Sequence, residues 1–171
     1  MSESTEDLTA AERAEADRQA VSEVIENSHV AVVTTIDADG ALVSRPLGLL
    51  QRDFDGYLYF FVPDPSEKTE QVRAKPATNV AIENRGNYLS IAGSGSIVKD
   101  PELIDEFWNS HAAAWFEGGR DDPAVALLKI EAVSAELLSL DSPRIVAAVK
   151  YAKAAVTKGQ PDLGDRTRVD F

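Results

Sequence analysis

The segment Tyr57-Leu-Tyr-Phe-Phe-Val62, followed by Pro63-Asp64-Pro65 and then by Ser66-Glu67-Lys68-Thr69, decides how this chain folds. Its first six residues are apolar or aromatic, which predicts a β-strand. The prolines end that strand because proline donates no ladder hydrogen bond, and Ser66 is a typical residue before the first turn of a helix. The segment therefore predicts a strand that leads into a short helix, with Lys68 in the first turn.

A second segment, Ser44-Arg45-Pro46, adds a guanidinium group. It lies in a run from residue 41 to 52 that is typical of a strand. The fork of Arg45 suits phosphate oxygens, and the open N–H groups at a helix start favour an anion near Ser66 and Lys68. Each residue also has a structural interpretation: an outward-facing arginine, an N-cap serine and a surface lysine. Together the two segments predict a site for one phosphate group, as in a phosphorylated cofactor.

The rest of the chain predicts a mainly β domain with flanking helices. Thr9 and Glu12 have the spacing of a capping box, which opens a first helix. The expected helices span residues 9–27, 66–75, 100–116 (with a break near Ser110) and 142–156, and the expected strands span 30–36, 41–52, 57–62, 79–83, 88–98 and 124–140, the last of them bent or bulged. Tight turns between the strands favour antiparallel pairing, so six strands form a small barrel. Residues 1–8 are expected to be a disordered acidic lead, residues 9–156 a single domain, and residues 157–171 an irregular tail.

Composition excludes several classes of function. A length of 171 residues favours one domain, and a net charge of −12 argues against binding to nucleic acid or to an anionic membrane surface. The chain has no cysteine, which excludes disulfides and thiolate metal sites. The acidic N-terminus does not have the form of a secretory signal, and no apolar run is long enough to span a bilayer. We therefore expect a cytoplasmic protein.

No residue of the sequence lies in a motif that is typical of a general acid, a general base or a nucleophile. Phe61 and Val62 end their strand either as core residues or as the lining of a cofactor pocket. Trp108 and Trp115 are seven residues apart, which predicts a shared helix face used for packing, for a dimer contact or, at Trp115, for a ligand. His29 and His111 are far apart in sequence, and no metal-binding or hydrolase motif is present. We infer a role that takes its chemistry from a cofactor.

With these residues in place, the chain resembles the pyridoxamine 5'-phosphate oxidase-like superfamily of FMN-binding split barrels, and most of all its general stress protein branch. The resemblance covers residues 20–171. It rests on an ordered set of segments: Ser44-Arg-Pro46, Arg52-Asp-Phe-Asp-Gly56, Tyr57-Leu-Tyr-Phe-Phe61, Ser66-Glu-Lys68, Tyr88-Leu-Ser-Ile-Ala-Gly93, Trp115-Phe-Glu-Gly-Gly119, Asp121-Asp-Pro123 and Leu127-Leu-Lys-Ile130.

The resemblance implies a six-stranded antiparallel split β-barrel that forms a homodimer, with FMN at the dimer interface. The residues that it assigns to the cofactor are Arg45, Lys68 and Ser66 at the phosphate, Arg45, Pro46, Leu47, Phe61 and Val62 along the ring system and ribityl chain, and Trp115 from the partner's helix as a cover. It implies an FMN-binding general stress protein, with flavin-dependent oxidoreductase activity on an unknown substrate. FAD in place of FMN, a deazaflavin-dependent reductase and a cofactor-free dimeric interaction module are the alternatives.

Two positions and the C-terminal segment depart from the family pattern. Val62 stands where the family often has threonine, and Glu67 stands where the oxidases themselves have arginine, so a contact to the anion is replaced by a negative charge. The C-terminal segment Asp165-Arg-Thr-Arg-Val-Asp-Phe171 does not match the substrate-binding end of the true oxidases. Oxidation of pyridoxamine phosphate is therefore not the expected activity.

Overall fold

A computed structural model of the protein describes residues 9–50, 53–139 and 165–171. The elements are α1 (Ala10–Glu26), β1 (Val30–Ile36), β2 (Leu42–Gly48), β3 (Tyr57–Pro63), α2 (Glu67–Ala74), β4 (Ala77–Asn84), β5 (Asn87–Val98), α3 (Pro101–Phe107), α4 (Ser110–Ala113), β6 (Val125–Ser139) and β7 (Asp165–Asp170). The six predicted strands and the capping box at Thr9 are confirmed. The predicted acidic lead and the helix expected at 142–156 lie outside the described residues. No helix in the described part of the chain has the length and apolar character needed to cross a membrane.

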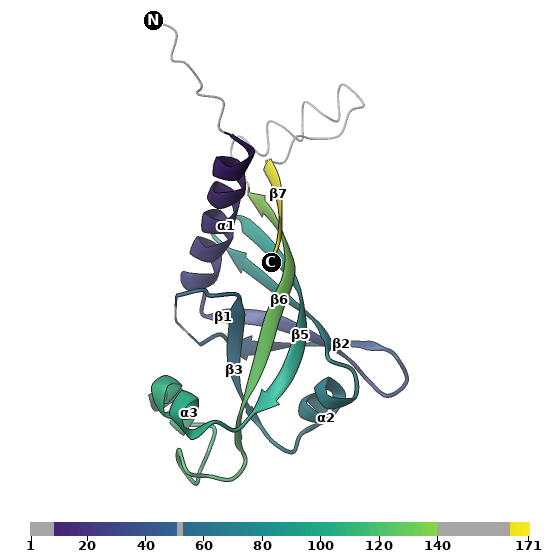
Figure 1. The fold of residues 1–171 in the computed structure, drawn as a ribbon. Helices are drawn as coiled ribbons and strands as arrows, with labels where there is room; N and C mark the ends of the chain where they lie inside the picture. Colours follow the sequence, from purple (N-terminus) through teal and green to yellow (C-terminus); the bar gives the residue numbers. More distant parts are fainter. Residues whose placement is uncertain (1–8, 51–52, 140–164) are drawn as a thin grey trace, which may run out of the picture.

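The strands form one antiparallel sheet in the order β2-β1-β4-β5-β6-β3, with β7 on β6 beside β3 (Figure 1). No ladder joins the end strands β2 and β3 among the described residues. A hydrogen bond spans this gap, in which the N–H of Leu50 donates to the carbonyl of Tyr59 over 3.0 Å. The sheet is therefore a barrel that is split between β2 and β3, as the resemblance implied.

The long strand β6 has two different partners along one edge. Its first half pairs with β3 and its second half with β7, while β5 pairs along the other edge. The register shifts between Ala92 and Gly93, which confirms the predicted irregularity. A Cβ atom at Gly93 would lie 2.6 Å from Ile130 and 2.7 Å from the carbonyl oxygen of Glu131, so the close approach of the two strands requires glycine here.

The prediction of an irregular C-terminal tail is wrong for residues 165–170, which form β7. This segment has little apolar character of its own, and only Val169 is buried against the core. Its strand conformation comes from pairing with the part of β6 that extends beyond β3. An unpaired edge offers open N–H and C=O groups, and a polar segment can satisfy them.

The two faces of β3 separate the core into two clusters. Leu58, Phe60 and Val62 point into the main core, which α1 covers, because alternate residues of a strand face opposite sides. Tyr59 and Phe61 point the other way, toward a second cluster under α3 and α4. β3 therefore contributes side chains to the main core and to the region below α3 and α4.

The predicted long helix at 100–116 is broken, as expected, into α3 and α4. Trp108 is the C-terminal cap of α3, and Asn109 begins a new helix by accepting a hydrogen bond from the N–H of Ala112 over 2.9 Å. The prediction that Trp108 and Trp115 share a face of one helix is therefore wrong. The break ends the helical period between them and Trp115 lies beyond the end of α4, so Trp108 packs against the second cluster while Trp115 is exposed.

Candidate functional site

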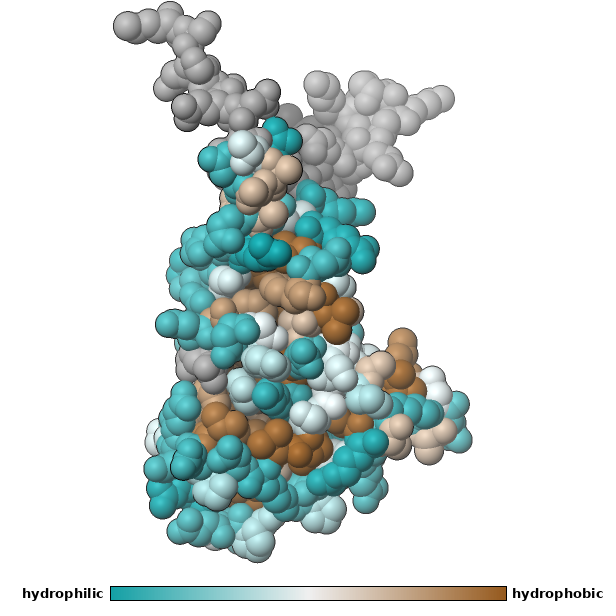
Figure 2. Space-filling view, in the orientation of Figure 1, coloured by the Kyte–Doolittle hydropathy of each residue, from teal (hydrophilic) through white to brown (hydrophobic). Residues whose placement is uncertain are grey.

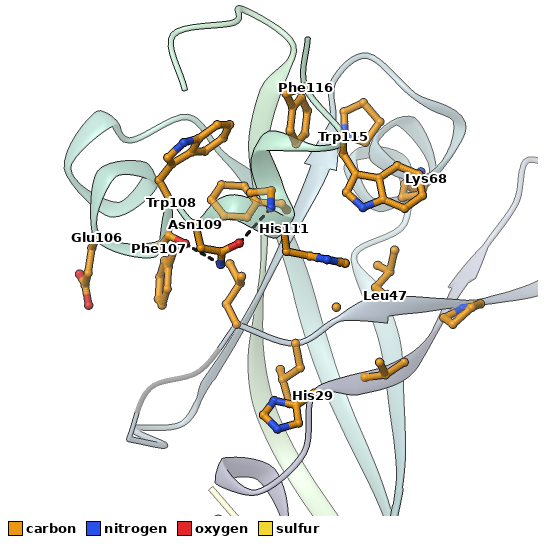
Figure 3. A pocket seen from close by; sticks show the side chains of 18 residues that line it. His29, Leu47, Lys68, Glu106, Phe107, Trp108, Asn109, His111, Trp115 and Phe116 are labelled. Atoms are coloured by element: carbon orange, nitrogen blue, oxygen red, sulfur yellow. Dashed lines mark hydrogen bonds between the residues drawn. The ribbon is translucent and has the colours of Figure 1, made fainter. Parts of the chain in front are cut away.

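A cavity of about 870 Å³ lies between the end of β2, the outward face of β3, the start of α2 and the α3–α4 segment (Figure 3). Leu47, Leu49 and Leu50 form one apolar wall, and Phe61 and Phe107 contribute to another. The volume lies within the range of about 300–1,000 Å³ that is typical of small-molecule sites. The cavity is therefore large enough for a flat organic cofactor.

Interlocked rings hold the wall of the cavity in place. The ring of Phe61 packs edge-on against Trp108, with centroids 5.7 Å apart, and against Phe116 at 6.3 Å. Trp108 and Phe116 also contact each other at 6.2 Å. Trp115, by contrast, lines the cavity with 76% of its surface exposed. The wall is preformed, whereas Trp115 offers an indole with few contacts inside the chain.

Lys68 places a cation at the cavity, from the first turn of α2. Its side chain is half-buried. Burial lowers the pKa of Lys68 below its usual value, and the nearby charge of Arg45 lowers it further, while Glu67 acts in the opposite direction. The ammonium group is therefore partly desolvated and close enough to Arg45 for the two cations to repel each other. An anion between them would relieve that repulsion.

Arg45 is held by a buried polar network behind the cavity. Its guanidinium donates to the hydroxyl of Thr35 over 2.7 Å, to the carbonyl of Val33 over 3.4 Å and to the side-chain oxygen of Gln71 over 3.2 Å. The Thr35 hydroxyl in turn donates to the same Gln71 oxygen over 2.6 Å. Burial lowers the pKa of Arg45, and the charge of Glu67 partly offsets that effect. The network fixes the guanidinium near the start of α2, and no carboxylate among the described residues forms an ion pair with it.

The structure brings five of the eight predicted cofactor residues to the cavity: Pro46, Leu47, Phe61, Lys68 and Trp115. The other three, Arg45, Val62 and Ser66, do not line it. The Val62 side chain is fully buried in the main core, because β3 alternates and Phe61 takes the outward position. Whether the residue at position 62 carries a methyl or a hydroxyl therefore does not change the cavity wall.

Ser66 occupies the position before α2 that the sequence predicted for an N-cap. The N–H of Ser66 donates to the hydroxyl of Thr69 over 2.9 Å, and that hydroxyl donates back to the Ser66 carbonyl at 2.9 Å. Thr69 thus stabilises the start of the helix. The first turn of α2, which carries Lys68, is therefore fixed in position.

Sequence reasoning missed several polar residues of the cavity, among them His29, Glu106, Asn109 and His111 (Figure 3). His29 lies just before β1. Its carbonyl accepts a hydrogen bond over 2.9 Å from the N–H of Leu49, the residue that follows β2. His111 comes from α4. The two histidines are 82 positions apart in the sequence, so no spacing rule could have paired them. In the part of the chain that the structure describes, no group of three side chains is arranged to hold a metal ion.

A second charged cluster fixes the connection from β3 to α2. Asp64 is buried, and its two carboxylate oxygens accept hydrogen bonds from the guanidinium of Arg73 over 2.7 and 2.9 Å. Lys99, just after β5, lies 3.1 Å from the same carboxylate. The bonds from Arg73 hold the pKa of Asp64 well below its usual range. This cluster anchors α2, and with it Lys68, to the end of β5.

At the level of sequence, this chain is similar to a protein family and to one fungal protein. A family model described as pyridoxamine 5'-phosphate oxidase like matches residues 16–162. The chain is 28% identical over 160 residues to protein bli-3 of Neurospora crassa, which covers 86% of this chain and 76% of that protein.

Two solved structures share the fold over most of their length. A general stress protein 26 candidate from Jannaschia sp. superposes with a TM-score of 0.70 and 26% identity, covering 92% of this chain and 99% of the other. The general stress FMN/FAD binding protein of Xanthomonas citri superposes with a TM-score of 0.66 and 25% identity, covering 75% and 92%. Both likenesses are to the fold as a whole.

Proposed function

Because the chain belongs to the pyridoxamine 5'-phosphate oxidase like family, whose model matches residues 16–162, we propose that it is a general stress flavoprotein that binds FMN. The observation that carries the proposal is the half-buried Lys68 at an aromatic-walled cavity, next to the fixed guanidinium of Arg45. The relative from Xanthomonas citri, which is described as an FMN/FAD binding protein, supports the same class of ligand.

The donor set of the site fits a flavin phosphate. Lys68 and the first turn of α2 would hold the phosphate, and the charge of Arg45 would act on it from behind. Charge-assisted hydrogen bonds contribute about 1.5–3 kcal/mol each. Leu47 and Phe61 would contact the ring system, since they form the apolar walls of the cavity. A bound flavin supplies electron transfer, and this chain's residues bind it, orient it and exclude water.

A homodimer is part of the proposal, because the open side of the cavity continues into an exposed apolar sheet face. Val30 and Pro46 line the cavity, and in the sheet Val32 pairs with Pro46 on one side and with Ala81 on the other. Val30 is 58% exposed and Val32 is 41% exposed. The β1–β2 hairpin also projects from the body with an apolar surface (Figure 2), where Leu42 is 74% exposed. A second copy that covers this face would also cover the cavity, and the partner's Trp115 could then reach it.

The dimer is tested by light scattering on the wild type and on Val32→Glu. The proposal expects twice the monomer mass for the wild type and a monomer for the variant, because a buried carboxylate without a partner is costly. A wild type that is monomeric at micromolar concentration would contradict the dimer.

The flavin is tested by the absorbance spectrum of the purified protein and by titration of the apoprotein with FMN. We expect micromolar or tighter binding in the wild type, and strongly weakened binding in Lys68→Ala. Arg18→Ala is the matched control, since it removes an exposed cation from α1, at the other end of the molecule from α2 (Figure 1). A colourless protein that also fails to bind added FMN would contradict the proposal.

Parallel titrations with FAD and with a deazaflavin rank the alternative cofactors. Tighter binding of the deazaflavin would replace FMN with the reductase alternative. If no flavin binds and the dimer persists, the cofactor-free interaction module is favoured. The proposed activity is a flavin-dependent oxidoreductase reaction with an unknown substrate, and the cytoplasmic location stays a prediction from the sequence.

A further inference from the structure

Glu67 places a negative charge within the cationic site. It is the first residue of α2, directly before Lys68, and its side chain is exposed. The side-chain amide of Gln71 connects it to Arg45: the Gln71 nitrogen donates to a Glu67 oxygen over 3.0 Å, and the Gln71 oxygen accepts from Arg45 over 3.2 Å. The carboxylate and the guanidinium are thus held at the two ends of one buried amide, without touching.

The charge of Glu67 acts on both cations. It raises the pKa of Arg45 and of Lys68, against the lowering effect of burial in each. The site therefore carries two positive charges and one negative charge, a net charge of +1. A phosphate monoester at neutral pH carries about −1.5 to −2, while a phosphate diester carries one negative charge. The repulsion from Glu67 grows with the charge of the ligand.

We propose that Glu67 is an internal counter-ion that tunes this site to the charge of its phosphate ligand. Repulsion from Glu67 lowers the affinity for a singly charged phosphate less than the affinity for a doubly charged one. The proposal rests on the proposed flavin site and deepens it. A flavin with a phosphate diester linkage, which carries one negative charge, is then a ligand of the same site, less penalised than the monoester dianion of FMN.

A purely structural role for Glu67 is the competing explanation, because acidic residues in the first turn stabilise a helix. Glu70 shares that role, since it also lies in the first turn of α2 and is exposed. Its charge acts on Arg73, and it is not a cause of the pKa shifts of Arg45 or Lys68. Glu70→Gln is therefore a matched control for Glu67→Gln.

The test measures the affinities of the apoprotein at pH 8 for FMN, for the monomethyl phosphate ester of FMN, which carries a single negative charge, and for riboflavin, which lacks the phosphate. In Glu67→Gln we expect FMN to bind about tenfold more tightly and a singly charged phosphate about threefold more tightly, from the scaling of the Coulomb energy with charge. The affinity for riboflavin should be the same in Glu67→Gln as in the wild type. Glu70→Gln should change none of the measured affinities. Equal FMN affinity in Glu67→Gln and wild type, or an equal gain for riboflavin, would overturn the proposal.

Inorganic phosphate separates this proposal from the flavin assignment. Its binding is followed by the NMR shifts of the backbone amides in the first turn of α2. If no flavin binds to any variant, the flavin assignment fails, while tighter phosphate binding to Glu67→Gln than to wild type would still support the counter-ion. Equal or absent phosphate binding in both proteins would overturn it.

Discussion

Two charged clusters at α2 carry the same set of charges in opposite arrangements. In the cluster that holds the connection from β3 to α2, the carboxylate of Asp64 is buried, accepts two hydrogen bonds from Arg73 in the last turn of the helix, and lies 3.1 Å from Lys99. At the start of the helix, the carboxylate of Glu67 is exposed and separated from Arg45 by Gln71. Two cations and one carboxylate thus form a closed structural cluster in one place and an open anion site in the other. Whether a carboxylate touches the cations decides which of the two results.

The largest expected effect comes from removing both cations of the open site. In Arg45→Ala/Lys68→Ala we expect FMN to bind about 100-fold more weakly, because the charge-assisted bond from Lys68, which contributes about 1.5–3 kcal/mol, and the favourable charge of Arg45 behind it are both lost. Fluorescence titration of the apoprotein measures this. The comparison breaks if the double variant keeps wild-type affinity while its circular dichroism shows an intact fold.

The closed cluster should respond through stability instead. Asp64→Asn is expected to lower the free energy of unfolding by about 2 kcal/mol, since a buried carboxylate with two bonds from Arg73 is replaced by a neutral amide. Urea denaturation measures the loss. The pKa of Asp64 is lowered in the folded state, so its stabilisation is present above the pKa of about 3.9 in the unfolded chain and is lost at more acidic pH. A variant with an unchanged urea midpoint would show that the cluster does not anchor α2.

A smaller effect is expected at Val62, on the strand that leads to both clusters. Val62→Thr restores the residue common in the family, but it places a hydroxyl in the main core and should cost about 1 kcal/mol. FMN affinity should stay within twofold of wild type, because this side chain does not line the cavity. A clear gain in FMN affinity would show that position 62 reaches the ligand.

The smallest expected effect is the dependence of stability on pH at Lys68. Its pKa is lowered from 10.5 in the folded state, so its charge costs stability at neutral pH. The folded protein binds fewer protons than the unfolded chain between the two pKa values, and the cost is therefore relieved as pH rises toward 10.5. The stability difference between Lys68→Met and wild type should shrink from pH 7 to pH 10. An unchanged difference would contradict a desolvated Lys68.

Local patterns predicted much of the fold. Tight turns between apolar runs predicted the antiparallel strands, and a capping box predicted the start of α1. The alternation of β3 was hidden, because residues on both of its faces are apolar, so the inward position of Val62 could not be separated from the outward position of Phe61. The strand β7 was missed since its conformation depends on pairing with β6.

The candidate site was predictable only where one segment carried the signal. Lys68 could be predicted as a site residue because one continuous segment shows a strand that leads into the start of a helix. The network of Arg45 with Thr35 and Gln71 joins three separate elements, so no local pattern indicated it. The same is true of His29 and His111, which the fold alone brings to one cavity. Long-range pairing thus determines the details that short-range chemistry leaves open.

The central claim is that Lys68 and Arg45 form a phosphate site, and the affinity ratio of FMN to riboflavin tests it most directly. The two ligands differ only in the phosphate, so the ratio isolates the contribution of that group. We expect FMN to bind about 100-fold more tightly than riboflavin to the wild type, with most of that difference gone in Arg45→Ala/Lys68→Ala. Equal affinity of the wild type for FMN and riboflavin would contradict the account.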